Sequence, residues 1–76
     1  MTPRNLLRAN RVRVTLDYYK HRVLKESGQV ELTDLVDLLT DIRHYCDWQS
    51  EEFLAADRMA RTHYLAELDN DELEPA

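Results

Sequence analysis

The sequence has few of the residues that cross-link a small protein or form its turns: one cysteine, one glycine and two prolines in 76 residues. A lone cysteine, Cys46, cannot form a disulfide within the chain, and this fits a reducing compartment. A single glycine excludes a glycine-rich loop that cradles phosphate. The prolines lie near the two ends, at Pro3 and Pro75, so we expect long helices with short joints and neither a barrel nor a sandwich.

Long apolar runs are also missing. No segment approaches the roughly 20 apolar residues that a membrane span needs, and residues 1–8 lack the apolar run of a signal peptide. We therefore expect a cytoplasmic protein without a membrane segment. A chain this short buries a modest share of its surface, and this one has neither a disulfide nor a Cys/His metal cluster to compensate. Oligomerisation is the remaining route to stability, so we expect a homo-oligomer.

The charges are sorted along the chain. Residues 1–27 carry a balance of +5 and residues 28–76 a balance of −10, which together make the net charge of −5 at pH 7. A basic first segment and an acidic remainder can pair within one molecule, between copies, or with an outside partner, and the sequence leaves these alternatives open. The overall negative charge argues against a general attraction to nucleic acid without excluding a local basic face.

The first helix is predicted to run from Pro3 to about Ser27. Thr2 is suited to cap it, Pro3 to its first turn, and Gly28 to end it in the left-handed conformation. Apolar residues at alternating steps of three and four predict a seam against another helix. They are Ala9, Val12, Leu16, Tyr19 and Val23. One position earlier runs a second stripe, here called the basic edge, which consists of Arg4, Arg8, Arg11, Thr15, Tyr18, Arg22 and Lys25.

Two shorter helices are expected to follow, capped by Thr33 or a neighbour and by Ser50. The apolar stripe of the second helix holds Leu32, Leu35, Leu39, Ile42 and Cys46, and the acidic stripe beside it holds Asp34, Asp37, Asp41 and His44. The narrower face of the third helix holds Phe53, Ala56, Ala60, His63 and Glu67. The simplest interpretation of the charged stripes is that they are solvated helix edges, which stabilise little even when they pair.

Together these patterns predict an all-α protein in which residues 1–68 form a single helical domain. The long first helix and the two shorter ones are expected to form a helical hairpin or an open three-helix bundle. All three have apolar faces that so small a monomer cannot cover, so we expect oligomerisation to complete the fold. Residues 69–76 are acidic and end in Pro-Ala, which predicts a disordered tail.

Catalytic and metal-binding patterns are sparse. Asp37, Asp41 and His44 lie at i, i+4 and i+7, and the Asp-x-x-His spacing is that of carboxylate-bridged bundles. Those bundles combine several such contributions, whereas this chain offers one. Cys46 lies on the apolar stripe, where a thiol is poorly activated, and its sequence neighbours face elsewhere on a helix. We therefore expect no cofactor and no enzyme activity. A metal-dependent enzyme, with its site assembled across an oligomer, remains an alternative to the two non-enzymatic functions considered below.

Two segments, LTDLVDLLTDIRHYCDW and FLAADRMARTHYLAEL, resemble short all-helical proteins of unknown function from bacterial phages, plasmids and integrated mobile elements. The resemblance lies in Leu35–Trp48 and Met59–Leu68. It consists of a Leu-Asp-Leu-Leu-x-Asp-(Ile/Leu)-x-His run, followed by a helix that ends in His-Tyr or His-Phe. The resemblance implies an accessory protein of a mobile element and brings no catalytic residues with it.

The leading functional interpretation is a non-enzymatic protein-interaction module that presents its basic edge to a protein partner. The expected partner-binding residues are Arg4, Arg8, Arg11, Tyr18, Arg22 and Lys25. The alternative is nucleic-acid binding by the same helix, in which the arginines follow phosphates and Tyr18 stacks or donates a hydrogen bond.

Overall fold

A computed structural model of the chain describes residues 1–73, with side chains as far as Asp69. Three α-helices follow one another: α1 (Pro3–Tyr18), α2 (Leu32–Trp48) and α3 (Phe53–Leu73), and a π-helical turn, η1 (Tyr19–Val23), continues α1. No strand forms within residues 1–73, so the prediction of an all-α fold is confirmed. None of these helices combines the length and the apolar character that crossing a bilayer requires.

The start of α1 follows the prediction. Thr2 has extended backbone angles, and its hydroxyl accepts a hydrogen bond from the Asn5 amide at 3.2 Å. Pro3 occupies the first turn, where the amide hydrogen that it lacks has no helical partner. Sequence and structure therefore agree on how this helix begins.

The end of this helix differs from the prediction of a regular helix to Ser27. From Tyr19 the helix widens, so that the Leu24 amide donates to the Tyr19 carbonyl at 2.9 Å, five residues back. Lys25 then takes the left-handed conformation (φ 58°), and the Glu26 amide donates to the Lys20 carbonyl at 3.0 Å. Gly28 also has a positive φ (96°), but it lies in the loop beyond. The prediction that Gly28 ends the helix is therefore wrong, since the wider turn closes onto Lys25 three residues earlier.

The cap of α2 falls on a neighbour of Thr33, as predicted, whereas the cap predicted for α3 is wrong. Glu31 precedes α2 in an extended conformation, and its amide donates to Asp34 Oδ2 at 2.7 Å, so the capping contact lies two residues before Thr33. Ser50 takes a left-handed turn conformation (φ 57°) in place of a helix cap. The first turn of α3 instead begins where the Ala56 amide donates to the Glu52 carbonyl at 3.2 Å.

The third helix is longer than predicted. It contains 21 residues, as many as α1 and η1 together, and it runs through Leu73. The domain boundary predicted at residue 68 therefore falls inside α3, and residues 69–73 are helical where disorder was predicted. The last three residues of that predicted tail, 74–76, lie outside the described residues.

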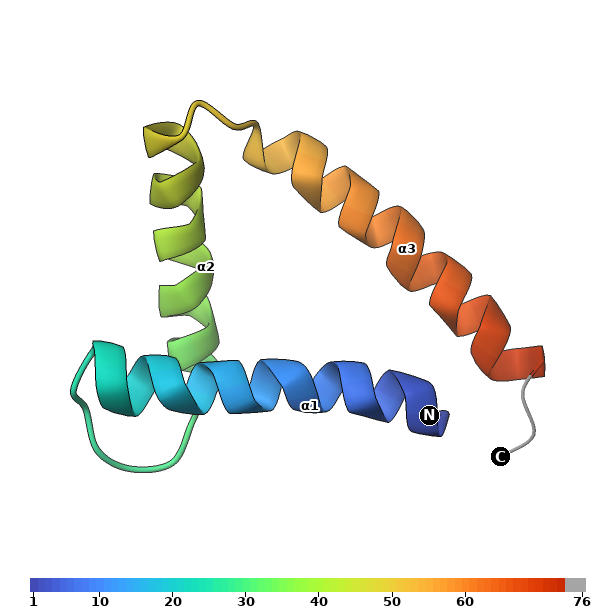
Figure 1. The fold of residues 1–76 in the computed structure, drawn as a ribbon, viewed down its shortest axis with the longest axis horizontal. Helices are drawn as coiled ribbons and strands as arrows, with labels where there is room; N and C mark the ends of the chain where they lie inside the picture. The colour runs from blue at the N-terminus through green and yellow to red at the C-terminus, as the bar shows by residue number, and fades with distance from the viewer. Residues whose placement is uncertain (74–76) are drawn as a thin grey trace.

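The three helices form an open triangle (Figure 1). From the C-terminal end of α1 and η1 the chain turns into α2, and α3 returns from the far end of α2 toward the N-terminus of α1. The principal extents are 40 × 33 × 15 Å, so the molecule is a flat plate whose thickness is less than half of either other dimension. The radius of gyration is 14.8 Å, against about 11 Å for a compact domain of this length. The open arrangement is thus observed, and the hairpin is not.

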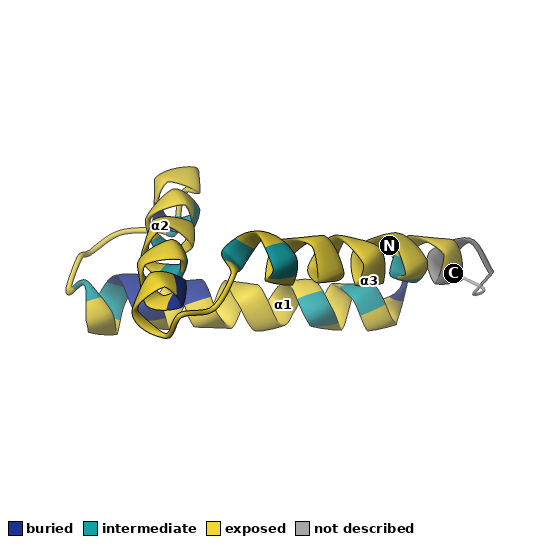
Figure 2. Cartoon of the chain, turned by 90° about the horizontal axis from the view of Figure 1, so that it is seen from above, coloured by how far each residue is buried: buried dark blue, intermediate teal, exposed yellow. Residues whose placement is uncertain are grey.

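Little of this plate is buried. Among the described side chains, the buried hydrophobic residues are Leu16, Tyr19 and Cys46. Figure 2 shows burial gathered mainly where the end of α1 and η1 meet α2. Many large apolar side chains of the predicted stripes are exposed instead, including Val12, Val23, Leu32 and Leu39. The helices therefore meet near their ends, and their apolar faces are left largely open along their lengths.

Candidate interaction surface

A buried ion pair holds the corner between η1 and α2. Lys20 Nζ lies 2.9 and 3.1 Å from the two carboxylate oxygens of Asp34, and both side chains are buried. The hydrogen bond from the Glu31 amide, and then Lys20, holds the pKa of Asp34 below its ordinary value. The hydrogen bond to Asp34 in turn raises the pKa of Lys20. The pair is therefore charged throughout the neutral range and fixes how η1 meets α2.

The neighbouring tyrosine binds a second carboxylate of α2. The Tyr19 hydroxyl donates a hydrogen bond to Asp41. This bond, together with burial and the negative charge of Asp41 and Asp37, raises the pKa of Tyr19 to about 12. Two consecutive side chains of η1 thus reach two different acidic residues of α2. Regular α-helical spacing does not predict this, because neighbouring residues point about 100° apart.

His21 joins the same turn to the following loop. Its Nε2 lies 2.7 Å from the Gly28 carbonyl oxygen, and its Nδ1 lies 3.3 Å from a carboxylate oxygen of Asp17. The imidazole therefore bridges the last turns of the first helix and the loop that leads to α2. These contacts give His21 a structural position at the corner.

The three candidate metal ligands do not form a site. Within residues 1–69, no group of three or more His, Cys, Asp or Glu side chains is placed to hold a metal ion, and this includes Asp37, Asp41 and His44. Asp41 accepts the hydrogen bond from Tyr19 instead. Cys46 is buried, as its place on the apolar stripe predicts.

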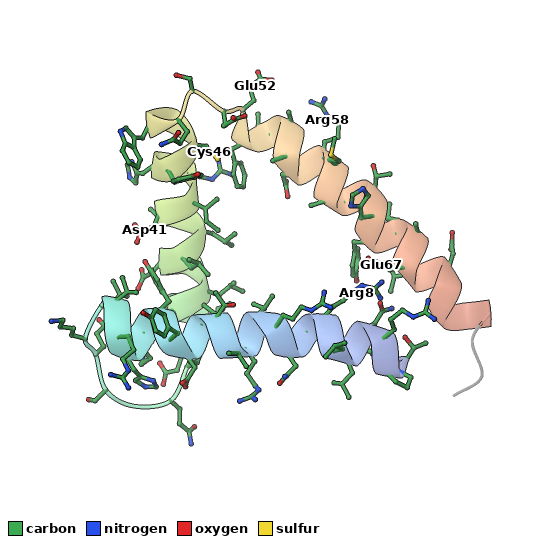
Figure 3. The ribbon with its side chains drawn as sticks, viewed as in Figure 1. Arg8, Asp41, Cys46, Glu52, Arg58 and Glu67 are labelled. Atoms are coloured by element: carbon green, nitrogen blue, oxygen red, sulfur yellow. The ribbon has the colours of Figure 1, made fainter. Side chains whose placement is uncertain are left out.

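The basic edge divides into parts with different environments. Arg8 forms an ion pair with Glu67 of α3 at 3.1 Å, and Asn5 Nδ2 donates to the Glu67 carbonyl at 3.1 Å. Figure 3 shows Arg8 and Glu67 meeting where α1 and α3 approach each other. Lys25 lies beyond the helix in the left-handed position, so the predicted edge does not continue to it in helical register.

The rest of the edge is exposed. Arg4, Arg11 and Tyr18 are exposed on α1, and Arg22 is exposed on η1. Within the part of the chain that the structure describes, Arg11 and Arg22 form no ion pair with an acidic residue. The structure therefore assigns Arg8 to an internal contact and leaves Arg11, Tyr18 and Arg22 on the outer surface.

A groove follows the line where α1 and α3 approach. It encloses about 300 Å³, and its apolar walls come from Met1, Ala9, Val12, Tyr64 and Leu68. Asn5, Arg8 and Glu67 complete the lining with groups that already bind one another. A second hollow lies between α2 and α3 around Cys46, Ala56 and Met59. Near it the Arg43 guanidinium lies 4.2 Å from the centre of the Phe53 ring.

Lys20 is the site residue that sequence reasoning missed. It belongs to neither predicted stripe of the first helix, and Asp34 belongs to a stripe that is predicted to be solvated. A signal was present, because Lys20 follows Leu16 by four residues and so lies on the same helical face. Its partner, 14 residues away, has no periodic signature, since the loop geometry decides which acidic residue it meets.

No family model, curated protein or solved structure matches this chain. The resemblance to proteins of mobile elements therefore stays a prediction.

Proposed function

We propose that this chain is a non-enzymatic helical interaction module that assembles with copies of itself and presents its basic edge to a protein partner. The resemblance of its second and third helices extends the proposal to an accessory or regulatory factor of a mobile element. The observation that carries the proposal is the amount of apolar surface that a single-layer chain leaves open. Large exposed apolar patches on a soluble chain mark protein interaction sites.

The non-enzymatic part of the proposal rests on how the chemically useful side chains are engaged. Asp34 binds Lys20, Asp41 accepts the hydrogen bond from Tyr19, and Cys46 is buried. A reactive carboxylate or thiol needs access to its substrate, which the buried Asp34 and Cys46 lack, and the exposed Asp41 is already engaged by the Tyr19 hydroxyl. What the outer surface offers instead is charge and apolar area.

Arg11, Tyr18 and Arg22 form the partner-binding part of the proposal. All three are exposed, and they lie along one side of α1 and η1. Arginine and tyrosine, together with tryptophan, are enriched among the residues that contribute most to binding at protein interfaces. An acidic partner surface would be attracted to these arginines. The acidic remainder of this chain would repel the same surface, so the partner would dock on the basic side.

The test is site-specific crosslinking in native host cells, with a photoreactive amino acid in place of Tyr18. We expect one crosslinked partner, whose yield falls sharply in the Arg11→Glu/Arg22→Glu variant. The matched control is Arg58→Glu/Arg61→Glu, which makes the same charge change on α3 and should keep the crosslink. Absence of any crosslinked partner, or equal loss in both variants, would contradict the assignment.

Nucleic-acid binding is the second candidate, because exposed arginines follow the same helix. Contacts with phosphates release counterions, so binding to duplex DNA would weaken steeply as salt increases. A titration of duplex DNA at several salt concentrations separates the two candidates. Steep salt-dependent binding that Arg11→Glu/Arg22→Glu removes favours nucleic acid, whereas no binding in low salt eliminates it.

A further inference from the structure

The groove between α1 and α3 has apolar walls, and within residues 1–69, whose side chains the structure describes, the side chains that line it remain substantially exposed. Val12, Tyr64 and Leu68 line it and expose 49%, 58% and 38% of their surface. The two charged side chains at the groove pair with each other, since Arg8 binds Glu67 at 3.1 Å. The groove therefore offers apolar area with its own charge neutralised, which suits an apolar surface as occupant.

The size of the open surface indicates what covers it. The chain exposes 6650 Å². A compact monomer of 9.0 kDa would expose roughly 4,900 Å². A stable interface removes about 800 Å² from each partner, so the excess is about twice what one such interface needs. One further copy of a chain this size supplies enough surface to cover the groove and the adjoining helix faces.

The layer structure points the same way. Stable domains pack at least two layers of helices or sheets around a core, and this plate is a single layer 15 Å thick. A second plate laid on the first supplies the missing layer. When the same face meets itself about a two-fold axis the assembly closes, whereas a head-to-tail contact would leave another groove open.

We propose that two copies of this chain pair face to face about a two-fold axis, with the α1–α3 groove of one meeting that of the other. This inference rests on the self-assembly part of the proposed function, and it adds which surface of the chain forms the dimer interface. Val12, Tyr64 and Leu68 form the centre of the interface. Because Arg8 and Glu67 neutralise each other within one chain, their side chains add no net charge to either of the two facing grooves.

The chain contains a matched pair of residues for the test. Val12 and Val14 are 49% and 53% exposed on the same helix, and two helical residues apart they point to nearly opposite sides. We expect the wild-type chain to sediment at twice the 9.0 kDa of one chain. Val12→Asp should reduce the mass to that of one chain, and Val14→Asp should leave the doubled mass unchanged. Circular dichroism reports whether each variant stays helical.

The wild-type chain supplies a second measurement, which does not depend on Val12→Asp remaining folded. In a mixture of isotope-labelled and unlabelled copies, intermolecular nuclear Overhauser effects should join Val12 or Leu68 methyl groups to the Tyr64 ring. A helical wild-type chain that stays at 9.0 kDa from micromolar to millimolar concentration would overturn both self-assembly and the proposed face. A doubled mass that Val14→Asp abolishes, or intermolecular effects confined to other residues, would overturn the face alone.

Discussion

At the scale of single residues, the corner of the molecule depends on a buried charge. An ion loses its hydration on burial, and this cost is offset only when hydrogen bonds satisfy the group. Asp34 meets that condition with both contacts from Lys20 Nζ and one from the Glu31 amide. Of the acidic residues on α2, it is therefore the one for which a partner matters most. A buried pair of this kind specifies which residues meet more than it adds to stability.

Removing one member of this pair should destabilise the chain strongly. Lys20→Met or Asp34→Ala leaves its former partner buried without a counter-charge, so each should lower the free energy of unfolding well below that of wild type. Asp37→Ala, an exposed change on the same helix, is the control and should have a small effect. The measurement is urea unfolding followed by circular dichroism at one fixed protein concentration. The combined variant Lys20→Met/Asp34→Ala should lose less than the sum of the single changes, and simple additivity would argue against the pair.

Tyr19 should make the protein sensitive to alkaline pH. Its pKa is raised from 10.0 to about 12 by the Asp41 hydrogen bond and by burial, so the folded state favours the neutral phenol. A group whose pKa is raised in the folded state contributes its full stabilisation of the fold at pH values below its pKa in the unfolded chain. That stabilisation is lost as pH rises from about 10 to about 12. The unfolding free energy of wild type should fall across this window more than that of Tyr19→Phe.

Ultraviolet titration measures the same pKa directly. The difference in tyrosinate absorbance between wild type and Tyr19→Phe should show a transition near pH 12. Asp41→Ala should move this transition toward 10.0, because it removes the hydrogen-bond acceptor that is the largest cause of the shift. A transition that stays in place in Asp41→Ala would mean that burial, and not this hydrogen bond, controls the pKa of the tyrosine.

At the scale of helices, the sequence predicts starts and faces better than ends. Thr2 and Pro3 mark the start of α1 because a cap and a first-turn proline act locally, through backbone groups a few residues away. The widened turn of η1 has no such local marker. The widened turn follows from tertiary contacts that bury Tyr19 and Lys20 together. An apolar stripe with helical period includes only Tyr19, so it does not predict that both residues are buried.

The left-handed residue that closes η1 is therefore a place where the chain can be improved. The left-handed conformation costs an ordinary residue roughly 1–2 kcal/mol. Glycine avoids that cost but adds roughly 0.5–1 kcal/mol of backbone entropy loss. Lys25→Gly should thus stabilise the chain by about 0.5–1 kcal/mol in urea unfolding, since Lys25 has φ 58°.

Two comparisons make that result specific. Ser50→Gly, at the other left-handed position (φ 57°), should also stabilise the chain. Ala60→Gly, inside α3, should destabilise it by about 1 kcal/mol. If Lys25→Gly instead lost stability like Ala60→Gly, Lys25 would not occupy a left-handed turn in solution.

At the scale of the whole molecule, helical periodicity predicts which face of each helix is apolar but not what covers it. Cys46 and Leu16 lie on predicted apolar stripes and are buried, whereas Val12 and Leu39 lie on the same two stripes and are exposed. The difference depends on where along its length each helix crosses its neighbour. That position is set by the loops and by the Lys20–Asp34 pair, which the stripes do not encode. The all-α class was therefore predictable, and the open triangle was not.

This uneven burial implies that α3 separates from the rest before the corner opens. The described contacts that hold α3 include the Arg8–Glu67 pair, the Asn5 hydrogen bond and the stacking of Arg43 on Phe53, and these groups are not fully buried. A partly exposed ion pair contributes only about 0–1 kcal/mol. In dilute solution, the amides of residues 56–68 should therefore exchange hydrogen faster than those of residues 16–20.

If a second copy covers the α1–α3 groove, protection of α3 should depend on protein concentration. Binding stabilises whatever it covers in proportion to the logarithm of the free partner concentration, so the exchange of residues 56–68 should slow as the protein is concentrated. Val12→Asp should remove that dependence, and Val14→Asp should keep it. Hydrogen exchange followed by mass spectrometry over a dilution series measures both. Protection of α3 that equals that of the corner at every concentration would mean that α3 is held within its own chain, by contacts stronger than a surface ion pair and one stacked ring.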